Sequence, residues 1–365
     1  MKKTLGVLTV MLCATSMIYA QADGIATHKS SDVVMASDGA AMGKVIASGS
    51  CGKNVNYELY DDYTLRIFGS GPMTNFDHII GALGTDAPWE DESQWIKAIK
   101  SVVIEDGVTR IGAHAFLGCT SLTEVIISNS VTSIGHEAFR DCKALTKIDI
   151  PCSVTCIGTF AFDGCSSLAE INLPNGIETI ESGVFYGCSS LEHITIPNSV
   201  TSIEHNAFHN CALLTEIIIP DSVTYIGMDA FSGCHNLEYV KIGKGVTTIG
   251  ECAFWNNNSD RELVVEITAE TRITVLGTTI NSFGEPEHIT IRVPGTTLAD
   301  YRSAGDWSYY MNRFVGYVPT ITGISSVRNG QPVMKSDAVY DLQGKKVSEM
   351  CPHGIYIVNG KKIMR

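Results

Sequence analysis

The sequence contains nearly the same 23 residues seven times in succession between residues 108 and 270. The fourth residue of every unit is isoleucine and the ninth is phenylalanine, and in six units a cysteine follows that phenylalanine by three positions. A self-similar period of about 20 to 29 residues is typical of a solenoid, in which each unit forms one coil. The units begin at Val108, Val131, Val154, Ile177, Val200, Val223 and Val246.

One half of each unit predicts a short strand. In residues 191–197 the apolar side chains of Leu191, Ile194 and Ile196 are interrupted by polar ones, as expected for a strand with one buried face. Prolines end four of these segments, where no ladder hydrogen bond is lost; they are Pro151, Pro174, Pro197 and Pro220. The other half of each unit has a second short apolar pair and room for one helical or 3₁₀ turn.

A single unit of this length buries too little apolar surface to fold alone, so neighbouring coils have to stack. We therefore predict an α/β repeat solenoid with short parallel strands and short helical or 3₁₀ turns, bent into a horseshoe. A small β-rich module is expected to follow it at the C-terminus.

The first residues resemble a secretory signal peptide. Lys2 and Lys3 precede an apolar run over residues 5–18, and Ala20-Gln21-Ala22 forms a small-x-small cleavage site, so residues 1–22 are the predicted signal. Leu12 before Cys13 disfavours a lipoprotein signal, which has a small residue there. No later stretch has the roughly 18 apolar residues of a transmembrane span. We expect an exported protein, either associated with the outer membrane at the cell surface or secreted.

The flanks of the repeats are expected to close the ends of the solenoid, because the outermost coils would otherwise expose their cores. After a linker over residues 23–43, residues 44–98 predict an N-terminal capping region, with a β-hairpin and a helical stretch near residues 89–99. The leucine-rich repeats cover residues 99–270.

Residues 271–319 predict degenerate repeats and a C-terminal cap. Strands are expected at residues 263–267, 273–276 and 289–293, followed by a short helix near residues 298–302. Residues 320–365 predict a linker and a small β module, because two short apolar segments there contain Gly turns followed by lysines.

Six of the 12 cysteines recur once per unit at an apolar position. On stacked coils these side chains point in the same direction about 4.8 Å apart, whereas disulfides need converging Cβ atoms about 3.8 Å apart. We expect them to pack as buried free thiols. Cys152 and Cys156, across a turn, are the pair best placed for a disulfide, and their state stays open.

The unit V-T-x-I-G-x-x-A-F-x-G-C-x-x-L-x-x-I-x-I-P-x-S resembles the BspA-like leucine-rich repeat proteins of bacterial and some protist surfaces. The match covers residues 99–270, and residues 50–106 are similar to the region that often precedes these repeats. Residues 339–362 are similar to C-terminal segments of exported Bacteroidetes proteins, some of which direct secretion and sorting to the surface. The resemblance implies a surface protein whose relatives include binders of host matrix proteins or cells, and it supplies no catalytic residues.

The outward side chains of the predicted strands form two columns on what would be the concave face. Such a face can make many weak contacts with a protein or a glycan. Simple solvation is the alternative for each residue, although Ile126 and Ile218 are apolar where solvent is expected. The candidate binding residues are Glu124, Lys147, Glu170, His193, Glu216 and Tyr239 in one column and Ile126, Asp149, Asn172, Thr195, Ile218 and Lys241 in the other.

A second polar set precedes the Ala-Phe pair of several units. His136 and His205 occupy the same unit position but lie three coils apart, roughly 14 Å, which is too far to share a metal ion. We therefore expect no metal site and no cofactor. The set comprises His114, His136, Glu137, Glu204, His205, Asn206, Asp229 and Glu251.

The sequence favours a binding protein over an enzyme. It has no H-E-x-x-H, G-x-S-x-G or S-x-x-K motif, and a hydrolase site within residues 44–100 is the remaining enzymatic alternative. A net charge of −13 without a basic, aromatic stripe argues against nucleic acid as a partner. We predict adhesion to an extracellular protein or glycan; the alternative is a structural or assembly component of the cell surface. The ligand and the oligomeric state stay open.

Overall fold

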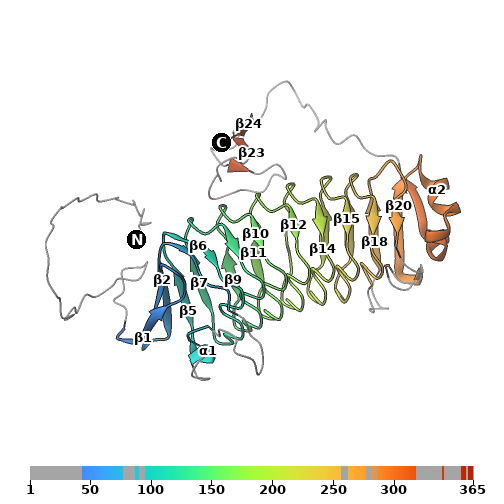
Figure 1. The fold of residues 1–365 in the computed structure, drawn as a ribbon. Coiled ribbons are helices and arrows are strands. Elements are labelled where there is room, and N and C mark those ends of the chain that lie inside the picture. Colours follow the sequence, from blue (N-terminus) through green and yellow to red (C-terminus); the bar gives the residue numbers. More distant parts are fainter. Residues whose placement is uncertain are drawn as a thin grey trace, which may run out of the picture. The chain divides into compact units, whose positions relative to one another are not determined.

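The computed structural model describes residues 43–76, 87–89, 95–255, 262–276, 282–283, 286–317, 339–340, 355–358 and 361–364. Between residues 43 and 317 the described chain winds into stacked coils, with each coil's strands beside those of the next (Figure 1). The predicted repeat solenoid is confirmed, and it consists mainly of strands and turns with few helices. The predicted signal peptide and all but the last residue of the predicted linker lie outside the described residues.

The first ladder of the solenoid joins the strands predicted in each unit. Within the repeats, the paired strands are parallel and in register at the 23-residue period, so Glu170 lies beside Lys147 and Ile171 beside Ile148. The isoleucines turn into the core and the charged residues away from it. The strands are β5 (Ser101–Ile104), β7 (Glu124–Ile127), β9 (Lys147–Asp149), β11 (Glu170–Asn172), β14 (Glu216–Ile219), β16 (Tyr239–Ile242), β18 (Leu263–Ile267) and β20 (Ile289–Pro294).

A second parallel ladder runs through the short apolar pair of each unit. Ile203 lies beside Ile226, and the corresponding isoleucine of every unit is buried. The strands are β4 (Gly71–Pro72), β6 (Val108–Ile111), β8 (Ser133–Ile134), β10 (Cys156–Ile157), β12 (Thr179–Ile180), β13 (Ser202–Ile203), β15 (Tyr225–Ile226), β17 (Thr248–Ile249) and β19 (Thr274–Val275).

The turn around each phenylalanine forms a third ladder. The Cys119 N–H donates to the Phe116 carbonyl of its own coil (3.2 Å), which is a 3₁₀-type bond, as predicted. The Phe116 N–H, however, donates to the Ala138 carbonyl of the next coil (2.8 Å). The seventh residue of every unit has a left-handed backbone, with φ from 50° at Glu137 to 63° at Gly183. The turn ladder joins successive coils of the repeats, including those between which the first or the second strand ladder is interrupted.

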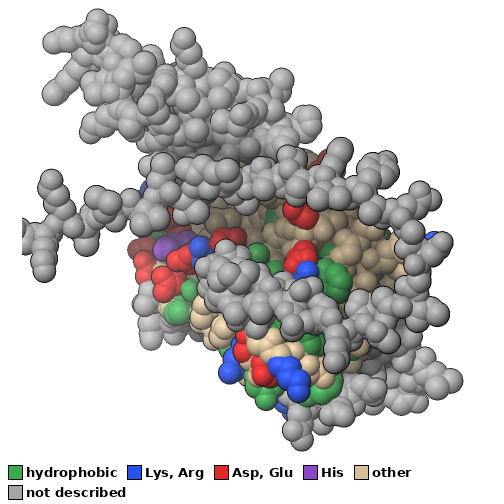
Figure 2. All heavy atoms as spheres, turned by 90° about the vertical axis from the view of Figure 1, so that its left-hand side faces the viewer, with side chains coloured by type: hydrophobic (Ala, Val, Ile, Leu, Met, Phe, Trp, Pro, Cys, Tyr) green, Lys and Arg blue, Asp and Glu red, His purple; other side chains and the backbone are tan. Residues whose placement is uncertain are grey.

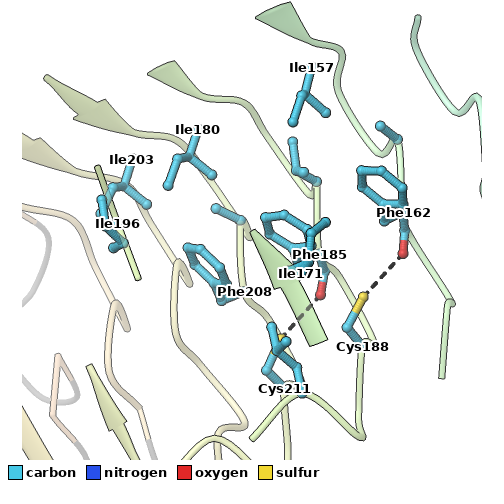
Figure 3. Close-up of a cluster of buried hydrophobic side chains, with 14 of the residues drawn as sticks. Ile157, Phe162, Ile171, Ile180, Phe185, Cys188, Ile196, Ile203, Phe208 and Cys211 are labelled. Atoms are coloured by element: carbon cyan, nitrogen blue, oxygen red, sulfur yellow. Dashed lines mark hydrogen bonds between the residues drawn. The ribbon is translucent and has the colours of Figure 1, made fainter. Parts of the chain in front are cut away.

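The core contains one continuous column of aromatic rings. Neighbouring phenylalanines of the repeats are stacked with their ring centroids 5.0–5.8 Å apart, and all are fully buried. Figure 3 shows Phe162, Phe185 and Phe208 in this stack, with the isoleucines of the second ladder packed beside it. The prediction that these rings line up is confirmed, and Phe283 extends the column beyond the repeats (5.2 Å from Phe254).

The periodic cysteines pack beneath this column, as predicted. The Cys188 thiol donates to the Phe162 carbonyl of the preceding coil (3.2 Å), and Cys211 does the same to Phe185 (Figure 3). Burial raises the pKa of the Cys234 thiol to about 12, so it stays protonated and unreactive at neutral pH. Cys152 and Cys156 are both free thiols.

The N-terminal end of the solenoid is covered by an antiparallel meander of β1 (Val45–Ser50), β2 (Val55–Tyr60) and β3 (Thr64–Gly69). Strand β3 then pairs in parallel with β5 and joins the first ladder. Within the stretch predicted as helical, the described helix is the short α1 (Trp95–Ala98). Trp89 stacks on Phe116 at 5.8 Å and donates its indole N–H to the Ala115 carbonyl (2.8 Å), so it begins the aromatic column.

At the C-terminal end, β18, β19 and β20 lie where strands were predicted, and the predicted helix is α2 (Leu298–Ser303). Trp307 stacks on Phe283 at 5.6 Å and donates its indole N–H to the Ile273 carbonyl (2.8 Å). Both described ends of the column are thus tryptophans anchored to a backbone carbonyl. The remaining elements are η1 (Pro286–His288), η2 (Gly305–Arg313) and β21 (Phe314–Tyr317).

A separate antiparallel sheet lies near the C-terminus. It has the order β22 (Val339–Tyr340), β23 (Ile355–Val358) and β24 (Lys361–Met364), so the segment predicted to form a small β module contains strands. Strand β23 pairs with both β22 and β24. None of the helices in the described part of the chain has the length and apolar character to cross a membrane.

Candidate functional site

The sheet face consists of the twelve predicted side chains that point outward from the first ladder. The structure places all twelve on the side opposite the buried isoleucines, because strand residues alternate between the two faces. Ile126, Tyr239 and Lys241 are half-buried, and the other nine are exposed. The two columns follow the strand register, as Glu216 lies beside Tyr239 and Ile218 beside Lys241.

One coil of this face departs from the prediction. Residues 191–197, which the structure describes throughout, have no assigned strand, so His193 and Thr195 lie on an irregular extended segment. Leu191 and Ile196 are nevertheless buried and both polar residues exposed. Packing of the apolar side chains therefore keeps the two columns aligned where the backbone ladder is interrupted.

The charges of the sheet face are largely solvated. The Lys147 ammonium lies 3.4 Å from the Asp149 carboxylate, and both side chains are more than half exposed. The Ser101 hydroxyl donates to the Glu124 carboxylate (3.2 Å). Exposed pairs of this kind contribute little to stability. These side chains are therefore available to a ligand at small cost.

The C-terminal half of the sheet face is less polar, and the column of Lys241 continues onto β18 and β21 with residues that the sequence analysis did not include. The Lys241 ammonium lies 3.7 Å from the Glu266 carboxylate on β18. Partial burial and the nearby Glu266 carboxylate raise the pKa of the Tyr239 phenol. Ile218 is 54% exposed beside these groups, and Val315 on β21 is 51% exposed. Aromatic and aliphatic side chains next to charges are typical of the centre of an interface.

A second group of polar side chains lies on the turn edge of the first two coils. The His114 and His136 rings are 5.1 Å apart and perpendicular, and the Glu137 carboxylate lies beside both. The sequence analysis included these residues in the second polar set but compared His136 with His205 instead of His114. Their proximity follows from the third ladder, in which the His114 N–H donates to the His136 carbonyl (2.9 Å). Figure 2 shows histidine, acidic and basic side chains grouped on the surface.

The repeats match a known family. A model described as the BspA type leucine rich repeat region, in six copies, matches residues 94–215 and 201–279, about half of the chain. The chain belongs to this family. BspA-type repeats occur in surface proteins, and leucine-rich repeats typically form surfaces for binding or scaffolding. No curated protein matches the sequence.

Solved structures of leucine-rich repeat proteins are similar to this chain over much of its length. The T. pallidum protein TpLRR is 26% identical, with 63% of this chain and 87% of that chain covered and a TM-score of 0.41. A Bacteroides ovatus leucine-rich repeat protein is 22% identical (67% and 73% covered, TM-score 0.44). A leucine-rich cell surface protein from Faecalibacterium prausnitzii is 24% identical (67% and 88% covered, TM-score 0.40).

Proposed function

We propose that this BspA-type repeat protein is a non-enzymatic adhesin that binds an extracellular protein or glycan through its sheet face. The observation that carries the proposal is the regular pair of outward columns, which presents Ile218, Tyr239 and Lys241 beside a row of solvated charges. A rigid, repeated surface of this kind recognises a ligand by many contacts along its length. The buried thiols, which burial keeps protonated, offer no nucleophile.

Replacing Glu170, His193 and Glu216 together by alanine is expected to weaken binding at least about tenfold, because the change removes three exposed contacts on consecutive coils of a surface that binds by many contacts. The measurement is biolayer interferometry of the full chain, without its signal, against a panel of extracellular matrix proteins and glycans. The melting temperature should stay unchanged, since exposed substitutions away from special features alter stability by less than about 0.5 kcal/mol each.

A matched control comes from the same three coils. Asn175, Asn198 and Asp221 are exposed and follow the three sheet-face residues by five positions, on the turns after the strands. Their triple alanine variant should bind as the wild type does. Equal affinity of the sheet-face variant, or binding to nothing on the panel, would exclude the proposed surface.

We also propose that the protein is exported and held at the cell surface by its C-terminal segment, residues 320–365. The signal-like sequence of residues 1–22 and the family both support export. In a Bacteroidetes host, intact cells producing the full chain should bind an antibody against the repeats. Cells producing a chain that ends at residue 319 should release it or retain it inside. Unchanged surface labelling of the shortened chain would contradict this role for the segment.

A further inference from the structure

We propose that His114, His136 and Glu137 form a binding site for a divalent transition-metal ion such as Zn²⁺, which joins the first two coils at their turn edge. Two imidazoles and one carboxylate are a common ligand set for such ions. The site lies away from the sheet face and is independent of the ligand proposed for that face.

The backbone of the repeats places the three side chains together. His114 and Glu137 are the seventh residues of consecutive units, and both have left-handed backbone, with φ of 56° and 50°. The third ladder fixes the offset between the coils through the bond from the His114 N–H to the His136 carbonyl. One coil therefore supplies His114, and the next supplies His136 and Glu137 as neighbours.

The distances between the ligand atoms suit one small ion. His136 Nε2 lies 3.1 Å from Glu137 Oε1, and His114 Nε2 lies 3.6 Å from Glu137 Oε2. One ligand atom from each residue can be chosen so that all lie within 4.8 Å of one another. Tetrahedral Zn²⁺, with bonds of about 2.0–2.1 Å, separates its ligands by about 3.4 Å. An ion at the centre requires only small rotations of the side chains.

Hydrogen bonds on the far side of each ring orient it toward the site. His114 Nδ1 lies 2.5 Å from the Phe76 carbonyl, and His136 Nδ1 lies 2.5 Å from the Thr159 hydroxyl. A carbonyl only accepts, so His114 carries a proton on Nδ1. In the neutral ring the Nε2 lone pair then faces the Glu137 carboxylate. These two acceptors, 3.6 Å apart, both present lone pairs to the space in which a metal ion would bind.

The surrounding charges are compatible with a bound cation. The Arg140 guanidinium lies 3.0 Å from Glu137 Oε1, which leaves the other carboxylate oxygen for an ion, and it is itself paired with Asp163 (3.0 Å). Lys143 is paired with Asp141 (3.3 Å). With neutral histidines, the group formed by these five charged side chains and the two histidines has a net charge of −1. The His136 side chain is 42% exposed, against 18% for His114 and 15% for Glu137, so an ion can enter and keep a water ligand.

The test is titration of the full chain, stripped with a chelator, with Zn²⁺ in a calorimeter and with Co²⁺ by visible absorption. One ion per chain is expected, with Co²⁺ spectra free of a sulfur charge-transfer band. Zn²⁺ should also raise the melting temperature, because only the folded chain brings these three ligands together. His114→Ala and Glu137→Gln should each weaken Zn²⁺ binding by about 100-fold or more while keeping the metal-free melting temperature.

His205→Ala is the matched control, since His205 occupies the unit position of His136 but has Gly183 and Asn206 in place of His114 and Glu137. It should bind Zn²⁺ as the wild type does. Absence of binding at millimolar Zn²⁺, or equal binding by His114→Ala and the wild type, would overturn the site. The cluster would then be a group of polar contacts between two coils and not a metal site. A fully folded Glu137→Gln variant, checked by near-UV circular dichroism, separates loss of a ligand from loss of structure.

Discussion

Replacing Phe185 by alanine is expected to lower the free energy of unfolding by about 3–5 kcal/mol, one of the two largest effects that we predict. The ring is fully buried near the middle of the aromatic column, with centroids 5.8 Å from Phe162 and 5.2 Å from Phe208. Its removal leaves a cavity between coils that are held at a fixed spacing by the turn ladder on both sides and by the second ladder on the C-terminal side. The neighbouring rings cannot move together to fill the cavity without breaking those ladders.

Urea unfolding followed by far-UV circular dichroism measures the loss. Every coil contacts only its neighbours, so a defect in the middle weakens the coupling between the two halves of the array. The two halves of the variant should therefore unfold in separate transitions. Tryptophan fluorescence reports from both ends, since Trp89 and Trp307 are buried there. Ile218→Ala serves as the control and should cost less than about 0.5 kcal/mol, because Ile218 is exposed on the sheet face. A decrease in the free energy of unfolding below about 1 kcal/mol for Phe185→Ala would show that the aromatic column contributes little to the stability of the core.

The 23-residue period predicts the column of phenylalanine rings, but it does not predict the aromatic residues at the two ends of that column. The seven phenylalanines recur at 23 residues, so their stacking follows from the repeat alone. Trp89, Phe283 and Trp307 join the same column at longer spacings, because these segments have additional residues between the rings. Only the packed structure shows that these three side chains occupy the repeat position. Sequence reasoning located the capping segments without identifying the residues that close them.

The turns show a second limit of the sequence analysis. Their 3₁₀-type bonds were predicted, whereas the ladder between turns was not. The seventh residue of each unit is left-handed although its identity varies, from His114 and Phe160 to Gly183 and Asp229. Non-glycine residues adopt this conformation when the surrounding structure requires it. The left-handed conformation of the seventh residue therefore cannot be recognised from the residue type, and it is imposed by the stacking of the coils.

The sheet face could be predicted from the sequence, whereas the proximity of His114 and His136 could not. The sheet face follows from strand alternation, so all twelve residues were correctly placed on one side. In the turn ladder the backbone bond joins residues 22 positions apart, such as His114 and His136, instead of 23. Comparing equivalent unit positions therefore pairs His114 with Glu137 and overlooks His136. This difference of one residue from the repeat period results from the geometry of the turn, and it is seen only in the three-dimensional structure.

Replacing Trp307 by alanine is expected to destabilise the C-terminal end by about 3–5 kcal/mol. The side chain is fully buried, stacks on Phe283, and packs edge-on against Tyr301 and Phe314 with centroids 5.3 and 5.5 Å away. Alanine also leaves the Ile273 carbonyl without its indole donor. Because terminal coils are held from one side only, the loss should be local, unlike that of Phe185→Ala.

Hydrogen exchange resolved along the chain distinguishes the two outcomes. In Trp307→Ala, amides of β20 and β21 should lose protection while those of β9 and β11 keep it. Trp307→Phe is the matched variant: it keeps a stacked ring but lacks the N–H, so it should lose only about 1–3 kcal/mol, the cost of an unsatisfied buried carbonyl. Uniform loss of protection in Trp307→Ala would mean that the array unfolds as one unit. Its end would then be no weaker than its middle, contrary to a solenoid in which each coil is stabilised only by its neighbours.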